Sequence, residues 1–283
     1  MSQALHRVGS GIPLQLWAMT RMPTLFISHG SPMFALEPTQ AGPLLQRLGE
    51  QLPRPRAVLV LSPHWMTQGV HVAVAAQPET IHDFGGFPQP LYEILYPAPG
   101  SPEVGTRALA LLDAAGWKAR AAPEQGLDHG AWVPIRHMFP HADVPVLQVS
   151  MPQDLDPQGA VRLGQALAPL ANEGVLIVGS GSLTHNLYEF RGATGAEGAP
   201  YVKDFVAWAR ATVQRRDEAG LVNFLSVAPH AQRAHPTYEH YLPLPFAFGA
   251  SAPDAPAHIL DGGIDYGMLS MDSFVFGPIP AVV

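Results

Sequence analysis

The 283-residue chain contains no cysteine. This absence excludes disulfide bonds, a thiol nucleophile, cysteine-ligated zinc and iron–sulfur clusters. Charge is also scarce, since Asp, Glu, Lys and Arg make up only 14% of the residues, against about 25% in a typical domain. The 16 basic residues are outnumbered by 23 acidic ones, and the formal net charge is −7. We therefore expect neither nucleic acid nor an anionic membrane surface as a partner.

Long apolar runs are missing too. No stretch approaches the roughly 18 residues of a membrane span, so we expect no membrane association. The first 22 residues hold a short apolar patch without a clear small-residue cleavage site, which argues against a secretory signal, and we predict a cytoplasmic protein. No linker divides the remainder. We predict a flexible N-terminal extension over residues 1–22 and a single catalytic domain over residues 23–283, and the oligomeric state stays open.

Four short apolar runs rich in β-branched residues predict strands over residues 24–28, 57–62, 144–150 and 175–180. They lack polar alternation, as is typical of strands buried on both faces of a parallel sheet. Proline and glycine signals predict helices over 103–115, from 157 to about 172, and over 201–219. Further edge strands are expected near Ile259 and Phe274. The predicted class is α/β, with a mainly parallel central sheet and helices on both faces.

Histidine is unusually frequent, with 13 copies against 16 lysines and arginines together. His29 follows the first predicted strand, His64 the second and His185 the fourth. The carboxyl ends of parallel strands meet at one edge of a sheet, where ligands bind, and neutral imidazole is the commonest metal ligand. A single histidine at a strand end is usually structural. Three at the same topological position favour a metal site, and we place the active site at that edge.

Two further segments contain chemically active residue types. His129 stands beside Asp128 and before Gly130, where it either caps a short helix or acts as a general acid and base. His235 and His240 flank Glu239, but their spacing of five residues puts them about 140° apart on a helix, unlike the metalloprotease pattern. Both approach one site if a helix begins between them at Pro236. Glu239 would then point elsewhere or support a ligand.

Together these segments resemble the DOPA-type extradiol dioxygenases, which belong to the class III ring-cleaving superfamily that also contains protocatechuate 4,5-dioxygenase. The likeness covers nearly the whole chain from about Pro23, with the motifs in family order. The motifs that carry it occupy residues 24–32, 61–65, 128–132, 181–187 and 234–243, and the segment 83–88 is similar to a loop of the family. Five ordered motifs are far more specific than any one of them.

The resemblance implies a non-haem metal held by His29, His64, His185 and His240, with His129 as acid and base beside the substrate. In the better-known ring-cleavage branch the third ligand is a glutamate, and a histidine like His185 is catalytic instead; both roles for His185 stay open. The expected working metal is Fe(II). An all-histidine site would also bind Zn(II). We expect substrate contacts from His235, Trp65 and Tyr238, and an aromatic wall that also includes Phe84 and Phe87.

The favoured hypothesis is extradiol cleavage of a catechol such as DOPA with O₂. Two alternatives remain. A zinc-bound water could hydrolyse an ester or amide without oxygen. The chain could also be a non-catalytic metal-binding member of the same superfamily, because a fold does not by itself establish a function.

Overall fold

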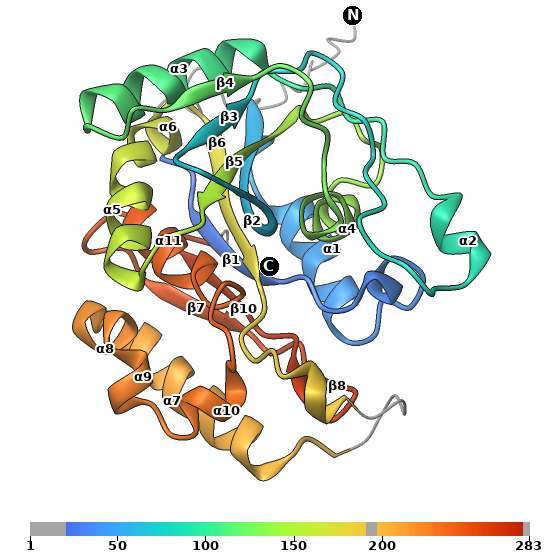
Figure 1. Ribbon diagram of the computed structural model, residues 1–283, viewed down its shortest axis with the longest axis vertical. Coiled ribbons are helices and arrows are strands. Elements are labelled where there is room, and N and C mark those ends of the chain that lie inside the picture. The colour runs from blue at the N-terminus through green and yellow to red at the C-terminus, as the bar shows by residue number, and fades with distance from the viewer. Residues whose placement is uncertain (1–20, 191–196, 280–283) are drawn as a thin grey trace, which may run out of the picture.

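An eight-stranded sheet forms the centre of the protein (Figure 1). The computed structural model describes residues 21–190 and 197–279. Across the sheet the strands follow the order β4 (Arg120–Ala122), β3 (His71–Ala73), β5 (Val146–Pro152), β2 (Ala57–Thr67), β6 (Val175–Gly181), β1 (Thr24–Ser28), β10 (Ser273–Phe276) and β7 (Ala257–Leu260). The central strands β5, β2, β6 and β1 are mutually parallel, whereas β10 and β7 form antiparallel pairs at one edge. A separate antiparallel pair joins β8 (Ile264–Asp265) to β9 (Leu269–Ser270).

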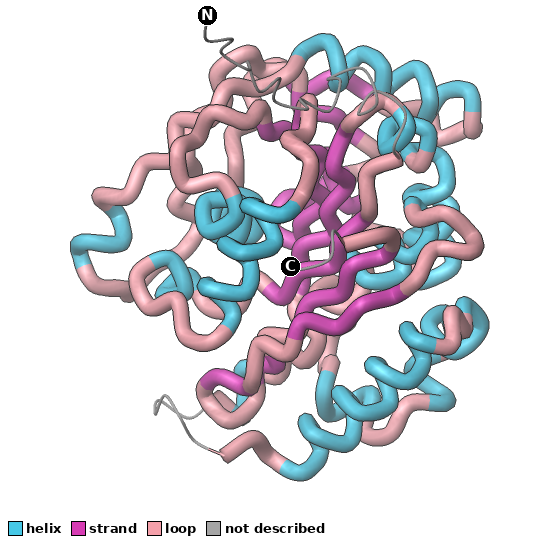
Figure 2. The backbone as a smooth tube through the Cα atoms, turned by 180° about the vertical axis from the view of Figure 1, so that it is seen from behind, coloured by secondary structure: helices cyan, strands magenta, loops and turns pink. Residues whose placement is uncertain are grey.

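Helices cover both faces of the sheet. In Figure 1, α5 and α11 lie on one side and α1 and α4 on the other, and Figure 2 shows the strands running between the two helical layers. The α-helices are α1 (Ala41–Gln51), α2 (Gln89–Tyr92), α3 (Pro102–Ala114), α4 (His129–Met138), α5 (Pro157–Leu167), α6 (Pro169–Asn172), α7 (Pro200–Gln214), α8 (Glu218–Val222), α9 (Phe224–Val227), α10 (Ala231–Ala234) and α11 (Pro243–Ala250). Short 3₁₀ turns, η2 (Pro32–Ala35) and η3 (Leu187–Glu189), follow β1 and β6. The predicted α/β class with a mainly parallel sheet is confirmed.

All four predicted buried strands are present, and so are the two edge strands near Ile259 and Phe274. β2 is longer than predicted and ends at Thr67, so His64 lies inside the strand rather than after it. The short strands β3 and β4 were not predicted. Each has three residues, too few for a period of two to be recognised.

Two predicted helices are each divided in the structure. The helix expected from 157 to about 172 ends at Leu167, and α6 begins at Pro169, because proline has no N–H to continue the helical hydrogen bonds. The helix expected over 201–219 ends at Gln214. Arg216 then adopts a positive φ of 55°, a left-handed conformation that turns the chain into α8.

The predicted helix start at Pro236 is wrong. α10 ends at Ala234, turns follow, and the next helix begins at Pro243. The turns are stabilised by contact with the sheet, because the Ser182 N–H at the end of β6 donates to the His240 carbonyl at 2.9 Å. A regular helix from Pro236 would use that carbonyl in its own hydrogen bonds.

Two hydrophobic clusters hold these layers together. The main cluster packs both faces of the parallel strands, including Leu59, Val149 and Ile177, against α1, α3, α4 and α5. A second cluster joins β10 to the helices that follow β6, with Phe205 and Phe274 among its fully buried rings. The parallel part of the sheet is thus buried on both faces, as its apolar sequence predicts.

The chain packs on the domain from Arg21 onward. The Met22 N–H donates to the Ala171 carbonyl at 2.9 Å, and Arg21 donates to Asn172 and to the Ala250 carbonyl. The predicted extension over residues 1–22 otherwise lies outside the described residues. Among the helices of residues 21–190 and 197–279, none combines the length and apolar character that a membrane crossing requires.

Candidate active site at the carboxyl ends of the strands

Five histidines from distant parts of the chain gather at one edge of the parallel sheet. Ring centroids lie 5.0 Å apart for His29 and His64, 4.0 Å for His64 and His129, and 5.4 Å for His29 and His240. His185 stacks on His240 with a centroid separation of 3.6 Å. The convergence expected of strand ends therefore occurs, and it includes residues from α4 and from the turn before α11.

A serine orients the imidazole of His29. The Ser180 hydroxyl, at the end of β6, donates to the Gly130 carbonyl, so its oxygen is free to accept from His29 Nδ1 at 3.0 Å. With the proton on Nδ1, the Nε2 lone pair of His29 faces the cluster. This Nε2 lies 3.1 Å from Nε2 of His64. Two nitrogens bound at right angles to one ion, each about 2.1 Å away, would be about 3 Å apart.

His129 is held by the start of α4. Asp128 caps this helix, because its Oδ1 accepts from the Ala131 N–H at 3.1 Å and from the Ser62 hydroxyl at 2.8 Å. Gln148 donates to Asp128 Oδ2 at 2.7 Å and accepts from the Asp128 N–H at 2.9 Å. Burial raises the pKa of Asp128 despite these hydrogen bonds. Asp128 and not His129 is therefore the side chain that caps the helix.

Asp83 binds His129 from a separate loop. One carboxylate oxygen accepts from the His129 backbone N–H at 2.8 Å, and the other accepts from His129 Nδ1 at 2.8 Å. Burial alone would raise the pKa of Asp83, but the hydrogen bonds and charge of His129 outweigh it and the pKa is lowered. Sequence reasoning missed this residue. Its one signal was its position in the loop segment 83–88 of the family pattern.

The turn before α11 brings His240 to the site. An added Cβ at Gly181 would lie 2.3 Å from the His240 carbonyl, so only glycine permits this close approach to β6. Glu239 accepts from His240 Nδ1 at 3.1 Å, which leaves Nε2 of His240 as the lone pair. Glu239 thus supports a neighbouring histidine, as one of the sequence interpretations held.

Two groups of possible metal-ligand atoms meet at this site. Ligand atoms of His29, His64 and His129 lie within 4.8 Å of one another, and so do those of His185, Glu239 and His240. Burial lowers the pKa of His29 and His240 well below the usual range. The pKa of His64 is lowered to about 3, mainly by burial and to a smaller extent by the charge of His129. The imidazoles of His29, His64 and His240 are therefore neutral at neutral pH, which is the form that binds metals.

Comparison with known proteins agrees with this site. Residues 23–276 match the family model described as the catalytic LigB subunit of aromatic ring-opening dioxygenase. A 4,5-DOPA dioxygenase extradiol of Beta vulgaris is 40% identical over 257 residues, 89% of this chain and 96% of the relative. The Escherichia coli K12 protein of the same name is 38% identical over 272 residues, 93% of this chain and 97% of the relative. The chain belongs to the LigB family.

A solved structure supports the same assignment. The crystal structure of an uncharacterized Escherichia coli K12 protein superimposes with a TM-score of 0.74 at 33% identity, covering 91% of this chain and all of that one. With relatives named extradiol dioxygenases along nearly the whole chain, this LigB-family protein is an extradiol ring-opening dioxygenase that acts on a small molecule and O₂.

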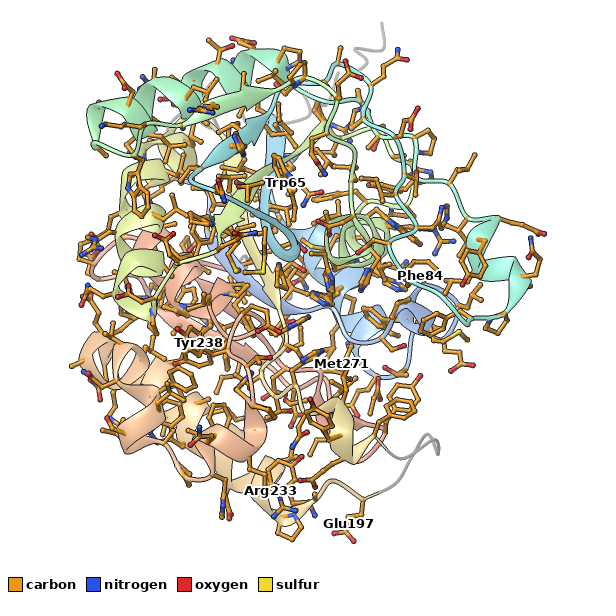
Figure 3. The ribbon with its side chains drawn as sticks, viewed as in Figure 1. Trp65, Phe84, Glu197, Arg233, Tyr238 and Met271 are labelled. Carbon is orange, nitrogen blue, oxygen red and sulfur yellow. The ribbon has the colours of Figure 1, made fainter. Side chains whose placement is uncertain are left out.

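The aromatic residues predicted to contact the substrate of the dioxygenase lie in different surroundings (Figure 3). Trp65 is half-buried against the main hydrophobic cluster, and Tyr238 is 38% exposed beside Phe224. Phe84 lies next to the five histidines. Its ring is edge-on to that of His129, with a distance of 5.7 Å between the two ring centroids. Phe87 packs behind Phe84 at 5.5 Å.

His235 does not lie with the other histidines of the dioxygenase. It is 1% exposed, and its Nε2 donates to the Leu183 carbonyl at 2.9 Å. Its ring packs edge-on against Phe205 and Tyr241 in the second hydrophobic cluster. The prediction that His235 contacts the substrate finds no support in this position, because the side chain is enclosed by aromatic rings.

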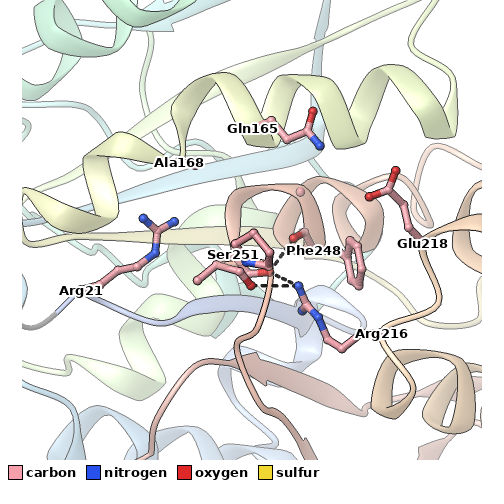
Figure 4. A pocket seen from close by; sticks show the side chains of 10 residues that line it. Arg21, Gln165, Ala168, Arg216, Glu218, Phe248 and Ser251 are labelled. Atoms are coloured by element: carbon pink, nitrogen blue, oxygen red, sulfur yellow. Dashed lines mark hydrogen bonds between the residues drawn. The ribbon is translucent and has the colours of Figure 1, made fainter.

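A surface cavity of about 440 Å³ lies away from the histidines of the dioxygenase, between α5, α8 and the end of α11. Figure 4 shows Arg216 donating to Ser251 inside it. The guanidinium carbon also lies 4.1 Å from the Phe248 ring centroid. These contacts join the chain after α7 to the end of α11, and we assign this arginine to packing.

Proposed function

We propose that this dioxygenase opens the aromatic ring of a catechol next to its two hydroxyls, using a metal ion held by His29, His64 and His240. The main support for this proposal is that the three imidazoles converge while their Nδ1 atoms face polar side chains outside the cluster. Nδ1 of His29 meets Ser180, and Nδ1 of His240 meets Glu239. Nδ1 of His64 lies 3.6 Å from Asp83. The hydrogen bonds at Nδ1 of His29 and His240 fix the tautomer that leaves Nε2 for the metal, and the Asp83 carboxylate favours the same tautomer of His64 by its charge.

The spacing of the three rings supports this ligand set. Their centroids lie 5.0, 5.4 and 5.1 Å apart for the pairs His29–His64, His29–His240 and His64–His240. Separations of this size suit three imidazoles that face one ion. Fe(II) is the proposed working metal, since it suits oxygenase chemistry, and Zn(II) suits the same nitrogen donors.

His185 receives a catalytic role in this proposal rather than a ligand role. Its ring is parallel to that of His240, with an interplanar angle of 9° and a centroid separation of 3.6 Å. A metal ion lies near the plane of each imidazole that binds it, because the nitrogen lone pair is in that plane. Two rings stacked face to face have separate, nearly parallel planes that cannot both contain one nearby ion, so His185 and His240 cannot share it in this arrangement.

His129 is the proposed acid and base at the substrate. Its Nδ1 donates to Asp83, so Nε2 is available to take a proton from a catechol hydroxyl and to return it after ring opening. His185 would be the second proton carrier. A bound Fe(II) would supply the acidification of the diol hydroxyls and an electronic link between the two reactants. Phe84, edge-on to His129, would flank the substrate ring.

Aerobic turnover with Fe(II)-loaded protein tests the proposal. DOPA, caffeate and protocatechuate are supplied in turn, while O₂ uptake and the absorbance of the ring-opened product are recorded together. We expect one O₂ consumed for each catechol opened with at least one of the three. Ester hydrolysis by the Zn(II)-loaded protein without O₂ uptake would instead support the hydrolase alternative. Metal binding without turnover of any of these compounds would support a non-catalytic role. The cytoplasmic location stays a prediction.

A further inference from the structure

Asp83 contacts the site from a loop for which the sequence predicted aromatic wall residues but no role for this carboxylate. The loop between β3 and α3 also carries Phe84 and Phe87, and it includes α2. The Asp83 side chain is 20% exposed, whereas the His129 side chain that it binds is only 6% exposed. A partly buried carboxylate bound to a nearly buried imidazole makes a strong, directional contact, because hydrogen bonds to charged groups are short and well aligned.

The two hydrogen bonds restrain His129 in different ways. The bond from the backbone N–H to Oδ1 fixes Asp83 against the first turn of α4. The bond from Nδ1 to Oδ2 fixes the ring orientation and requires the proton to be on Nδ1. The same Oδ2 lies 3.6 Å from Nδ1 of His64. One carboxylate therefore faces both a proposed metal ligand and the proposed acid and base.

The contact also docks the loop. Phe84, the next residue, packs edge-on to His129 at 5.7 Å and lies 5.3 Å from the Tyr92 ring. His82, the preceding residue, is bonded to the Ile94 carbonyl at 3.0 Å and packs against Trp132. The aromatic wall of the site is thus fixed to the rest of the loop and, through Asp83, to α4.

We infer that Asp83 is a positioning residue: it holds His129 in the tautomer whose unprotonated Nε2 faces the site, and it docks the loop that places Phe84 beside that ring. The catalytic meaning of this role rests on the proposed function. The tautomer of His129 does not depend on the proposed function, and it can be measured in the absence of turnover.

The test replaces Asp83 by Asn in the full chain loaded with diamagnetic Zn(II). In D83N the amide oxygen can still accept from the His129 backbone, but its NH₂ group faces Nδ1 and favours the opposite tautomer. Nitrogen NMR of histidine-labelled protein, with His129 assigned by its loss in His129→Gln, reports which ring nitrogen carries the proton. We expect a protonated Nδ1 in the native protein and a largely unprotonated Nδ1 in D83N.

Kinetics of the Fe(II)-loaded protein give the second measurement. In D83N we expect kcat to fall about 10²- to 10⁴-fold, the size of effect that a wrong tautomer has on an acid–base histidine. KM should change less than about threefold and metal content should be unchanged. Asp83→Glu keeps the carboxylate and should retain the native tautomer with part of kcat. If D83N does not fold, Asp83→Ser removes the carboxylate and is measured in the same way.

His82→Gln is the matched control, because it disturbs the same loop one residue away and leaves Asp83 in place. Its His129 tautomer should be native. A native tautomer in both D83N and Asp83→Ser would overturn the inference, and so would a tautomer change of equal size in His82→Gln. A tautomer change in D83N without catechol turnover by the native protein would uphold the positioning role and reject the proposed function.

Discussion

Buried histidines occur in two regions of this molecule, and the two regions use them differently. At the edge of the parallel sheet, His29 and His240 are 2% and 6% exposed, and in the second hydrophobic cluster His235 is 1% exposed. Burial lowers the pKa in all three cases. The contrast lies in the hydrogen bonds. His29 and His240 are bonded through Nδ1, whereas His235 is bonded through Nε2, and within residues 21–190 and 197–279 its buried Nδ1 has no hydrogen-bond partner.

The comparison teaches that burial and a lowered pKa do not identify a metal ligand. A ligand also needs its lone pair aimed at other lone pairs. His29 meets this condition, because its Nε2 lies 3.1 Å from that of His64. His235 does not, since aromatic rings surround it.

The largest effect should follow from His29→Ala. Removing this ligand should abolish stoichiometric metal binding and lower kcat/KM for a catechol by at least about 10³-fold, because several kcal/mol of metal-derived stabilisation are lost. Metal analysis after dialysis measures the bound metal, and O₂ uptake with the catechol measures kcat/KM. Full metal occupancy in this variant would remove His29 from the ligand set and weaken the contrast with His235.

His185→Gln should separate catalysis from metal binding. With His240 and not His185 as the ligand, we expect metal content close to native and a fall in kcat of about 10²- to 10⁴-fold, the usual contribution of an acid–base group. His240→Ala is the paired variant and should lose metal. Loss of metal from His185→Gln together with retention in His240→Ala would reverse the two assignments.

Ser180→Ala should have a smaller effect on the same centre. The His29 ring would lose the oxygen that accepts from its Nδ1, and removing such an outer partner typically weakens metal affinity about 10- to 100-fold. Competition with a chelator of known affinity measures the change. Ser62→Ala serves as a nearby control, because it removes a donor to Asp128 and an acceptor of the His64 backbone N–H but no partner of a ligand imidazole. We expect it to bind metal more tightly than Ser180→Ala.

His235→Leu should have the smallest effect on activity, with kcat/KM within about threefold of native. Its effect should appear in stability at low pH. Burial lowers the pKa of His235 to about 4, whereas an unfolded histidine has a pKa of about 6.5. Between these values only the unfolded chain binds the proton, so the free energy of unfolding falls as pH decreases through this window, by up to about 1.4 kcal/mol per unit.

Urea unfolding of the metal-free protein at pH 7 and pH 5 measures that dependence. At pH 7 we expect His235→Leu to lower the free energy of unfolding by about 1–3 kcal/mol, because the Leu183 carbonyl loses its donor. Between pH 7 and pH 5 the variant should lose less stability than the native protein. An equal loss in both proteins would mean that His235 does not contribute, and a large drop in activity would restore it as a substrate contact.

Sequence reasoning predicted most of the sheet and most of the histidines that the structure brings together. The four buried strands were found because each is a continuous apolar run, and His29, His64 and His185 were found because they follow such runs. His129 and His240 came from local neighbours and from family resemblance. Asp83 could not be assigned a role, because its partner His129 is 46 residues away in the sequence and no spacing rule joins them.

The sequence by itself determined that this protein is a mainly parallel α/β fold with an imidazole-rich site at one sheet edge. Apolar strand periods and the absence of cysteine are local and compositional facts, so they need no knowledge of packing. The tertiary structure decided which histidines turn their lone pairs toward one another. That choice depends on acceptors such as Ser180, Asp83 and Glu239 at each Nδ1, and on the parallel stacking of His185 with His240, because a lone pair has a direction only after the ring has a partner.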